Sequence, residues 1–196
     1  MIDAILRRRS IRKYKQDPIP RSLIEEVLKA GILAPSSKNR QPWKFIVVTG
    51  EARKEAVRTM KTGIDRERKT PYLPASAPYI RDALFTVRIM EQAPVLIFVM
   101  NELGYSLNKT LTRDEHVSEI CNAESIGAAI ENMTLAATDL GLGSLWVANT
   151  YFAYPELCTY LHSKGELVAA LALGYPAEAP ARRPRKSLEE AVEWRE

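Results

Sequence analysis

The sequence predicts an α+β fold in which several helices surround a small sheet, and three observations support this class. The chain has 196 residues, which suits one domain or a protomer that a partner completes. Hydrophobic residues make up 46% of the chain and charged residues 27%, a balance typical of a globular protein with a buried core. Helical patterns alternate with short apolar runs and cover more of the sequence than those runs do. We therefore interpret residues 1–196 as a single domain.

The first third of the chain predicts two helices, a strand and a third helix. Apolar residues at helical spacing predict helices over residues 2–9 and about 20–33, and Pro20 suits the first turn of the second helix. A polar segment between two prolines leads into a strand over residues 43–49, and a charged helix is expected from about Glu51. Residues 62–78 contain three prolines and Gly63, which predicts an irregular loop.

The rest of the chain predicts three more helices and three more strands. A helix over residues 79–91 leads to an apolar strand over 95–100. Residues 117–140 form the most apolar helix, which is expected in the interior or in a subunit interface. Strands over 144–148 and 167–173 enclose a short helix over 154–162, and the tail beyond residue 176 is rich in Pro and Arg.

Positive charge is concentrated in two short clusters near the two ends of the chain. The formal net charge is +4, but six basic residues lie within 7–15 and four within 182–186, so the rest of the chain is net acidic. A nucleic-acid binder more often spreads its charge along a face and interleaves aromatic residues. Two small clusters favour a small anion such as a phosphate, if the fold brings them together.

Several function classes lack their sequence signals. Neither a glycine-rich dinucleotide fingerprint nor a phosphate loop ending in Lys-Ser or Lys-Thr is present. His116 and His162 have no metal ligands at suitable spacing, and Cys121 and Cys158 lie far apart in apolar surroundings. These two cysteines cannot form a disulfide scaffold, so we expect a cytoplasmic protein. No apolar run approaches the roughly 20 residues of a membrane helix. If the protein is an enzyme, its reactive atoms are expected to come from a cofactor.

Three segments have the chemistry to hold a cofactor, although each also has an ordinary structural interpretation. Residues 8–12 gather three guanidinium groups and a hydroxyl, which suit a phosphate or simply a solvated helix end. Residues 35–43 collect short hydroxyl and amide groups that suit a heteroaromatic ring or a helix-to-strand turn. Residues 182–186 suit an anion clamp or a solvated tail.

Six ordered motifs carry a resemblance to a known family. The chain opens with Arg-Arg-Ser-Ile-Arg at 8–12 and continues with Ala-Pro-Ser-Ser-Lys-Asn-Arg-Gln-Pro-Trp at 34–43. The central helix contains Ser-Ile-Gly-Ala-Ala-Ile-Glu-Asn-Met at 125–133, followed by Leu-Gly-Leu-Gly-Ser-Leu-Trp at 140–146. Gly-Tyr-Pro at 174–176 and Arg-Pro-Arg-Lys at 183–186 close the series. Together they resemble the nitroreductase family of FMN-dependent oxidoreductases over nearly the whole chain.

The resemblance implies a fold, an assembly and a set of cofactor contacts. The fold would be a three-layer α/β/α sandwich with a small, mostly antiparallel sheet, and two protomers would interlock into a homodimer with one FMN in each interface pocket. One subunit would supply a basic group and the other a polar loop, while further residues would contact the phosphate and the flavin N5 and O4 region. By resemblance these FMN-binding residues are Arg8, Arg9, Ser10 and Arg12; Pro35, Ser36, Ser37, Asn39 and Gln41; Arg183 and Arg185; Ala148 and Asn149; and Arg88.

The resemblance also implies a reaction and its partners. NAD(P)H would reduce FMN and leave, and a nitroaromatic, a quinone or a related electron-poor acceptor would then take the electrons. No side chain would act as a covalent catalyst; Arg12 would stabilise negative charge on the reduced ring. Several relatives have a Glu-Gly pair where this chain has Ala148 and Asn149, which changes the local polarity.

The partners would be a second copy and a small acceptor, with neither nucleic acid nor membrane. Three alternatives stay open at this point. They are a non-catalytic FMN-binding or sensing module, a reductive dehalogenase-like member of the same family, and a basic protein that uses both clusters on nucleic acid.

Overall fold

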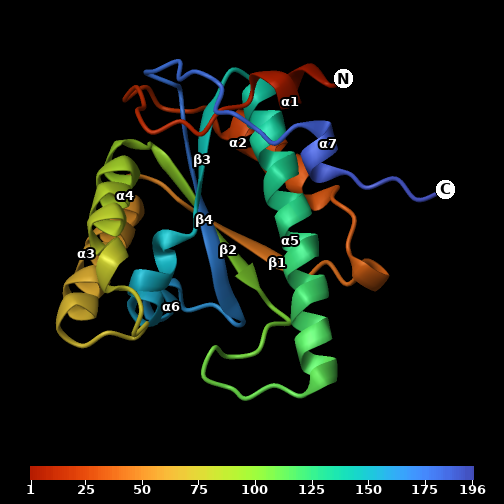
Figure 1. Cartoon of the computed structure of the whole chain (residues 1–196). Coiled ribbons are helices and arrows are strands. Elements are labelled where there is room, and N and C mark those ends of the chain that lie inside the picture. Colours follow the sequence, from red (N-terminus) through yellow and green to blue (C-terminus); the bar gives the residue numbers. More distant parts are fainter.

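A four-stranded antiparallel sheet forms the centre of the computed structural model, which describes residues 1–196 (Figure 1). The strand order is β1–β2–β4–β3, and each pair of neighbours is antiparallel. A parallel bridge between Ser10 and Ser144 extends the β3 edge, so the sheet is mostly antiparallel as expected. The strands are β1 (Trp43–Val48), β2 (Val95–Asn101), β3 (Gly143–Val147) and β4 (Glu166–Gly174).

Helices cover both faces of the sheet and form the two outer layers of a sandwich. On one face lie α3 (Gly50–Lys69), α4 (Ile80–Gln92) and α6 (Tyr154–Leu161); on the other lie α2 (Arg21–Ile32) and α5 (Arg113–Asp139) (Figure 1). Side chains along a strand alternate between faces, so β2 serves both cores. Leu96 and Phe98 pack in the α3–α4–α6 core, while Val95 and Ile97 pack in the α2–α5 core. The expected three-layer α/β/α class is therefore confirmed.

Helix α5 begins at Arg113, four residues before the start that its apolar pattern predicts. Thr112 caps it: the Thr112 hydroxyl accepts a hydrogen bond from the Glu115 backbone, and the Glu115 carboxylate accepts one from the Thr112 backbone. Ile126 and Met133, in the later part of the helix, are buried against α2 and the sheet. That apolar run is therefore interior to the protomer.

The expected loop over residues 62–78 is wrong in its first part, because α3 continues to Lys69. The buried face of the helix runs on through Gly63, Ile64 and Glu67. Gly63 packs against η3 (Asn149–Ala153), where an added Cβ would lie 2.3 Å from the Cβ of Ala153. Its lack of a side chain therefore serves a close helix contact, and the prolines lie beyond the helix end. They lead into η2 (Ala77–Tyr79), which precedes α4.

The turn after α3 is tied down by the buried carboxylate of Glu67. This group accepts hydrogen bonds at 2.8 Å from the backbone N–H groups of Tyr72 and Leu73 and from the hydroxyl of Ser76, and it is ion-paired with Arg66. Burial by itself raises the pKa of Glu67, but these hydrogen bonds together hold that pKa below its usual value. The proline-rich segment is consequently an ordered turn.

The N-terminal segment crosses one end of the sheet from the β3 edge to the β1 edge. Helix α1 (Asp3–Arg7) is shorter than the predicted 2–9. The Ile11 backbone N–H then donates to the Ser144 carbonyl at 2.9 Å, and the Lys15 N–H donates to the Tyr175 carbonyl at 2.9 Å. Further on, the Gln16 side chain donates to the Gln92 carbonyl at 3.1 Å. This path places residues 8–12 at the end of the sheet.

The tail also contains a short helix that the sequence analysis did not predict. Helix α7 (Leu188–Ala191) begins with a second capping box, between Ser187 and Glu190. None of the helices in the structure has the length and apolarity needed to cross a membrane.

Candidate functional site

The two basic clusters, nearly the whole chain apart in sequence, line a single cavity. A bridge between Tyr14 and Pro176 and a hydrogen bond from the Ala177 N–H to the Lys13 carbonyl at 2.9 Å lay the tail beside the N-terminal segment. The tail therefore returns past residues 8–12. We call the resulting space, of about 310 Å³, the arginine cavity; it is lined by Ile5, Arg8, Arg9, Ser10, Arg12, Glu131, Pro180, Ala181, Arg182, Arg183 and Arg185.

Tyr14 and Glu178 fix the crossing point of these two segments. The Tyr14 hydroxyl donates to the Ile11 carbonyl at 2.8 Å, and the Glu178 carboxylate accepts the Arg12 backbone N–H at 2.5 Å. Burial, and then the nearby charge of Glu178, raise the pKa of the Tyr14 phenol, although Arg12 opposes them. Tyr14 therefore stays a neutral anchor.

Most of the positive charge in the arginine cavity has no acidic partner. Only Arg8 forms an ion pair, with its Nε 3.1 Å from Oε1 of Glu131. Arg9 and Arg12 donate to backbone carbonyls of neighbouring residues, and Arg185 does the same. Five uncompensated guanidinium groups around one small space repel each other, and a multivalent anion relieves that repulsion. The donors therefore fit a phosphate group.

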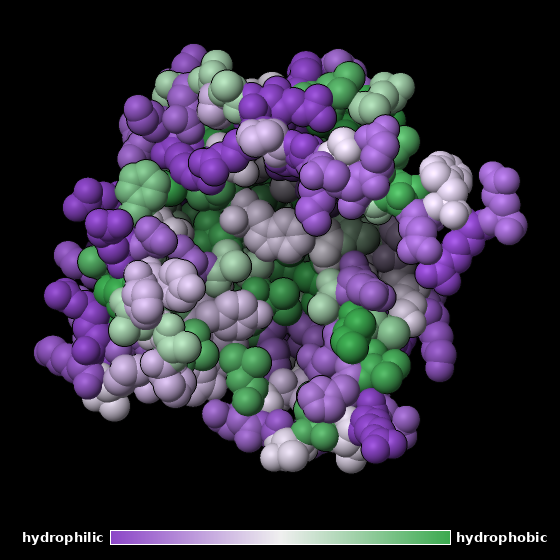
Figure 2. Space-filling view, viewed as in Figure 1, coloured by the Kyte–Doolittle hydropathy of each residue, from purple (hydrophilic) through white to green (hydrophobic).

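A second cavity of about 520 Å³ adjoins the first and shares Arg12 and Arg183 with it. We call it the aromatic cavity, because Phe85 and Trp146 present exposed rings there, at 53% and 43% accessibility. Figure 2 shows a hollow in this face between α4 and α5, with pale and green side chains inside it and purple ones above it. The remaining lining residues are Asp82, Thr86, Ile89, Leu145, Val147, Ala148 and Asn149.

The two cavities together suit an elongated ligand with a phosphate at one end and a flat ring at the other. Apolar and aromatic walls with a few polar groups are typical of cofactor sites. The expected residues Ala148 and Asn149 line the aromatic cavity, while Arg8, Arg9, Ser10, Arg183 and Arg185 line the arginine cavity. Arg12 lines both cavities.

Arg88 lies elsewhere. It lines a third cavity of about 420 Å³ on the outer side of α4, together with Arg81, Asp82, Leu84 and Phe85. Asp82 and Phe85 line both this cavity and the aromatic cavity, so the two cavities are neighbours. Arg88 therefore lies next to the candidate site but does not line it.

The polar loop over residues 35–42 is also separate from the arginine cavity within one chain. Its short turn η1 (Ser37–Asn39) is anchored to α5 by a 3.2 Å hydrogen bond from the Ser37 N–H to the Ser125 hydroxyl. Ser125 lies six residues before Glu131, which is about 9 Å along a helix and about 120° around it. The loop and the arginine cavity therefore lie on different sides of α5.

The backbone of this loop is strained in an unusual way. Lys38, Asn39 and Gln41 have φ values of 53°, 52° and 47°, although none of them is glycine. The Gln41 N–H donates to the Ser36 hydroxyl at 3.0 Å, and the Gln41 side chain donates to Asn39 at 3.2 Å, which holds the turn in shape. Strained backbone of this kind collects at binding sites. The loop thus has the character of a preformed contact surface.

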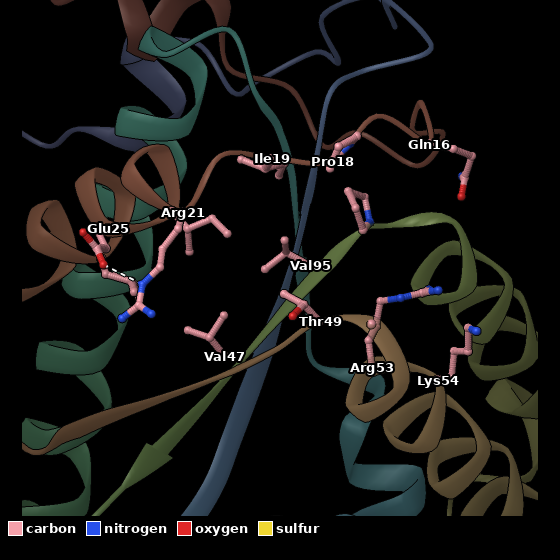
Figure 3. Close-up of a pocket in the computed structure, with 14 residues that line it drawn as sticks. Gln16, Pro18, Ile19, Arg21, Glu25, Val47, Thr49, Arg53, Lys54 and Val95 are labelled. Atoms are coloured by element: carbon pink, nitrogen blue, oxygen red, sulfur yellow. Dashed lines mark hydrogen bonds and ion pairs between the residues drawn. The ribbon is translucent and has the colours of Figure 1, made fainter.

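The largest cavity, about 720 Å³, lies at the opposite edge of the sheet, between α2, α3 and β1 (Figure 3). It also contains three cations, of which two have acidic partners. Arg21 pairs with Glu25 at 2.8 Å, and Lys54 pairs with Glu51 at 2.5 Å. Arg53 donates to the carbonyls of Met90 and Glu91, at the end of α4. Arg53 is therefore the one cation of this β1-edge cavity without an acidic partner, against five in the arginine cavity.

Sequence reasoning missed several residues of the site, four of which are polar, charged or aromatic residues on α4 and α5. Asp82, Phe85 and Thr86 lie on the face of α4 that lines the aromatic cavity, and Glu131 neutralises Arg8. The helical spacing of Asp82, Phe85 and Thr86 with Ile89 is a signal that could have pointed to a common face. Nothing in the local sequence indicates that Glu131 reaches Arg8.

The fold and the site define a class of protein: a three-layer α+β sandwich in which an arginine-lined cavity adjoins an aromatic one beside the edge strand β3. Residues 5–175 match the nitroreductase family, and the chain belongs to that family.

The individual relatives are distant but cover the whole chain. The chain is 30% identical over 197 residues to an NADH dehydrogenase of Thermus thermophilus, with 98% of this chain and 94% of the relative aligned. An iodotyrosine deiodinase of Thermotoga neapolitana is 26% identical, with 96% and 95% aligned. A crystal structure of an FMN complex from Desulfovibrio desulfuricans is similar at a TM-score of 0.73 and 27% identity, covering 99% of this chain and 95% of the other.

Proposed function

We propose that the protein is an FMN-dependent oxidoreductase that uses NAD(P)H to reduce nitroaromatic, quinone or related electron-poor acceptors. The observation that carries this proposal is the convergence of unpaired arginines from both chain ends on a cavity that continues into an aromatic one. The similarity to an FMN complex and to an NADH dehydrogenase supports the cofactor and the electron donor. Bound FMN would supply the redox chemistry, accepting a hydride equivalent and passing it on.

The residues of the arginine cavity would hold the phosphate. Arg9, Arg183 and Arg185 have no acidic partner, so each can offer paired N–H donors to phosphate oxygens. The Ser10 hydroxyl adds a neutral donor at the same wall. Arg8 would act more weakly than the others, because Glu131 already compensates its charge.

Arg12 would tune the ring. It is shared by both cavities and its only hydrogen bond from the guanidinium is to the Ser10 carbonyl at 3.1 Å, so its charge is uncompensated. A fixed cation beside a ring that gains negative charge on reduction stabilises the reduced state. Phe85 and Trp146 would exclude water from the ring and offer flat surfaces to a flat acceptor.

A homodimer would complete the site, because the loop over residues 35–42 does not reach the arginine cavity of its own chain. This loop is flanked by apolar side chains that nothing in the protomer covers: Leu33 is 80% exposed, and Ile32, Val117 and Ile120 are also exposed. A second copy packed on this patch would bury it and bring Pro35, Ser36, Ser37, Asn39 and Gln41 to the neighbouring cofactor.

The assembly has its own test. Leu33→Glu with Ile120→Glu should turn a dimer into a monomer and abolish FMN retention, measured by light scattering and absorbance after gel filtration. A wild-type protein that is monomeric at micromolar concentration and still retains FMN would contradict the shared site.

The central test is spectroscopic. Purified protein should be yellow, or become so with added FMN, and NADH or NADPH should bleach it in anaerobic stopped flow. Nitrobenzene or a benzoquinone should then restore the colour. Protein that stays colourless with FMN contradicts the proposal, and bound FMN that neither nicotinamide bleaches indicates a non-catalytic module. Reoxidation by iodotyrosine alone would support the dehalogenase alternative, which the similarity to a deiodinase keeps in view.

A further inference from the structure

A short hydrogen-bond chain lies on one wall of the aromatic cavity. The Thr86 hydroxyl donates to the backbone carbonyl of Asp82 at 3.0 Å, one turn earlier in α4. The Asn149 side-chain amide donates through Nδ2 to the Thr86 oxygen at 2.8 Å. Thr86 is only 7% exposed, while Asn149 is half-buried and opens η3 directly after β3. This series of hydrogen bonds therefore links a buried position of α4 to the rim of the candidate site.

This arrangement sets which end of the Asn149 amide faces the cavity. With its proton committed to the Asp82 carbonyl, the Thr86 hydroxyl can only accept from its other neighbour, so it selects the NH₂ end of Asn149. If the amide were reversed, Oδ1 of Asn149 would face Thr86 and would have to accept the Thr86 hydroxyl proton. The hydrogen bond from Thr86 to the Asp82 carbonyl would then be lost, leaving one hydrogen bond in place of two. Oδ1 of Asn149 is thereby left as an acceptor, and it has no hydrogen-bond partner within the chain.

We propose that Thr86 is a positioning residue that holds the Asn149 amide oxygen toward the flavin N5 edge and so favours reduced over oxidised FMN. This inference rests on the proposed function and on the family resemblance, which implies that residues 148 and 149 lie beside the N5 and O4 atoms. Oxidised FMN presents only a lone pair at N5, whereas the hydride from NAD(P)H leaves an N–H there. A fixed acceptor repels the first state and accepts a hydrogen bond from the second.

The decisive variant is Thr86→Val, which keeps the shape of the side chain but removes the oxygen that selects the amide orientation. Once free to rotate, the Asn149 amide can offer its N–H to oxidised N5. We expect the affinity ratio of reduced to oxidised FMN to fall about tenfold, which lowers the two-electron midpoint potential by about 30 mV. The Kd of oxidised FMN should stay constant or decrease. Dye-equilibrated redox titration and flavin-fluorescence titration measure the two quantities.

Two further variants separate positioning from simple support of the fold. Thr86→Ser retains the hydroxyl and should keep the wild-type potential. Asn149→Ala removes the acceptor without changing any residue of α4, so it should lower the midpoint potential as Thr86→Val does. The double variant should have nearly the same potential as either single variant. This second route keeps the proposal testable if Thr86→Val fails to fold.

The outcomes are distinguishable from those of the proposed function. If wild-type protein binds no FMN, the proposed function fails. If Thr86→Val weakens binding of oxidised FMN and leaves the potential unchanged, Thr86 only supports the fold and this inference is overturned. An unchanged potential in Asn149→Ala overturns it equally.

Discussion

Two cavities at the same end of the sheet differ in how the protein treats their charge. The larger, at the β1 edge, contains Arg21, Arg53 and Lys54; Arg21 and Lys54 have acidic partners, and only Arg53 does not, although it donates to two carbonyls. The smaller, at the β3 edge, contains six arginines, of which only Arg8 has an acidic partner. Volume alone would select the larger cavity as the binding site. The number of cations without an acidic partner selects the smaller one, five against one, because a bound anion would relieve the repulsion among them.

The largest expected effect tests this contrast directly in FMN affinity. Arg183→Ala together with Arg185→Ala removes two uncompensated guanidinium groups and should raise the Kd of FMN by about 10²- to 10⁴-fold, since one charge-assisted contact is worth about 10- to 100-fold. Fluorescence titration measures the change. The matched control is Arg21→Ala with Arg53→Ala in the β1-edge cavity, which should leave the Kd within twofold. Equal losses in both pairs would remove the contrast.

A charge that the fold fully satisfies should instead affect stability. Glu67→Gln leaves the donors of Tyr72, Leu73 and Ser76 facing a neutral amide and leaves Arg66 without one of its carboxylate partners. We expect a loss of about 3 kcal/mol in the free energy of unfolding, measured by urea denaturation, because three hydrogen bonds to a buried charged acceptor are each worth more than those to a neutral amide. FMN affinity per folded molecule should not change.

The same group predicts a pH dependence with a definite sign. The folded-state pKa of Glu67 lies below its unfolded value, so its contribution to stability is complete above about pH 5. That contribution is lost as the pH falls through the unfolded value of about 4.3 toward the folded one. Urea midpoints between pH 7 and pH 4 should therefore fall less steeply in Glu67→Gln than in the wild type. Parallel curves would show that Glu67 is not stabilised as its hydrogen bonds indicate.

Sequence patterns predicted the sandwich well, because its strands and most helices have clear periodicity. They failed at the end of α3, which continues past Gly63 because that glycine packs on the distant Ala153. They also missed α7, although its capping box between Ser187 and Glu190 is a local signal within a tail rich in Pro and Arg. The basic clusters and the segment at Ala148 and Asn149 were identified from sequence motifs. Their convergence was not predictable from local sequence, since it depends on the bridge between Tyr14 and Pro176.

Other features of the site also depend on contacts or orientations that the local sequence does not determine. The pairing of Arg8 with Glu131 joins residues 123 positions apart, and no periodicity reports it. The left-handed backbone at Lys38, Asn39 and Gln41 involves no glycine, so the sequence gives no signal for it. Arg88 lies between Thr86 and Ile89, which line the aromatic cavity, but its side chain lines a different cavity, a distinction that depends on helix orientation.

A smaller effect concerns the cation that supports the fold at the β1 edge. Arg53→Met removes the donor to the Met90 and Glu91 carbonyls, which α4 leaves unsatisfied near its end. We expect a loss of about 1 kcal/mol in unfolding free energy, with the apolar stem of the side chain retained. A loss of FMN without a loss of stability would assign this cavity a binding role instead.

The smallest effect has the opposite sign and is the most specific to the arginine cavity. Without ligand, the unpaired arginines repel one another, so Arg183→Ala alone should stabilise the apoprotein, by roughly a few tenths of a kcal/mol, even as it weakens FMN binding. The gain should shrink as salt rises from 0.01 to 0.5 M, because screening removes the repulsion that the substitution relieves. Thermal unfolding of apoprotein at both salt concentrations measures it, with Arg53→Met as the variant that loses stability at either. A destabilised Arg183→Ala apoprotein would mean that this charge is already compensated within the chain, and the two cavities would no longer differ in kind.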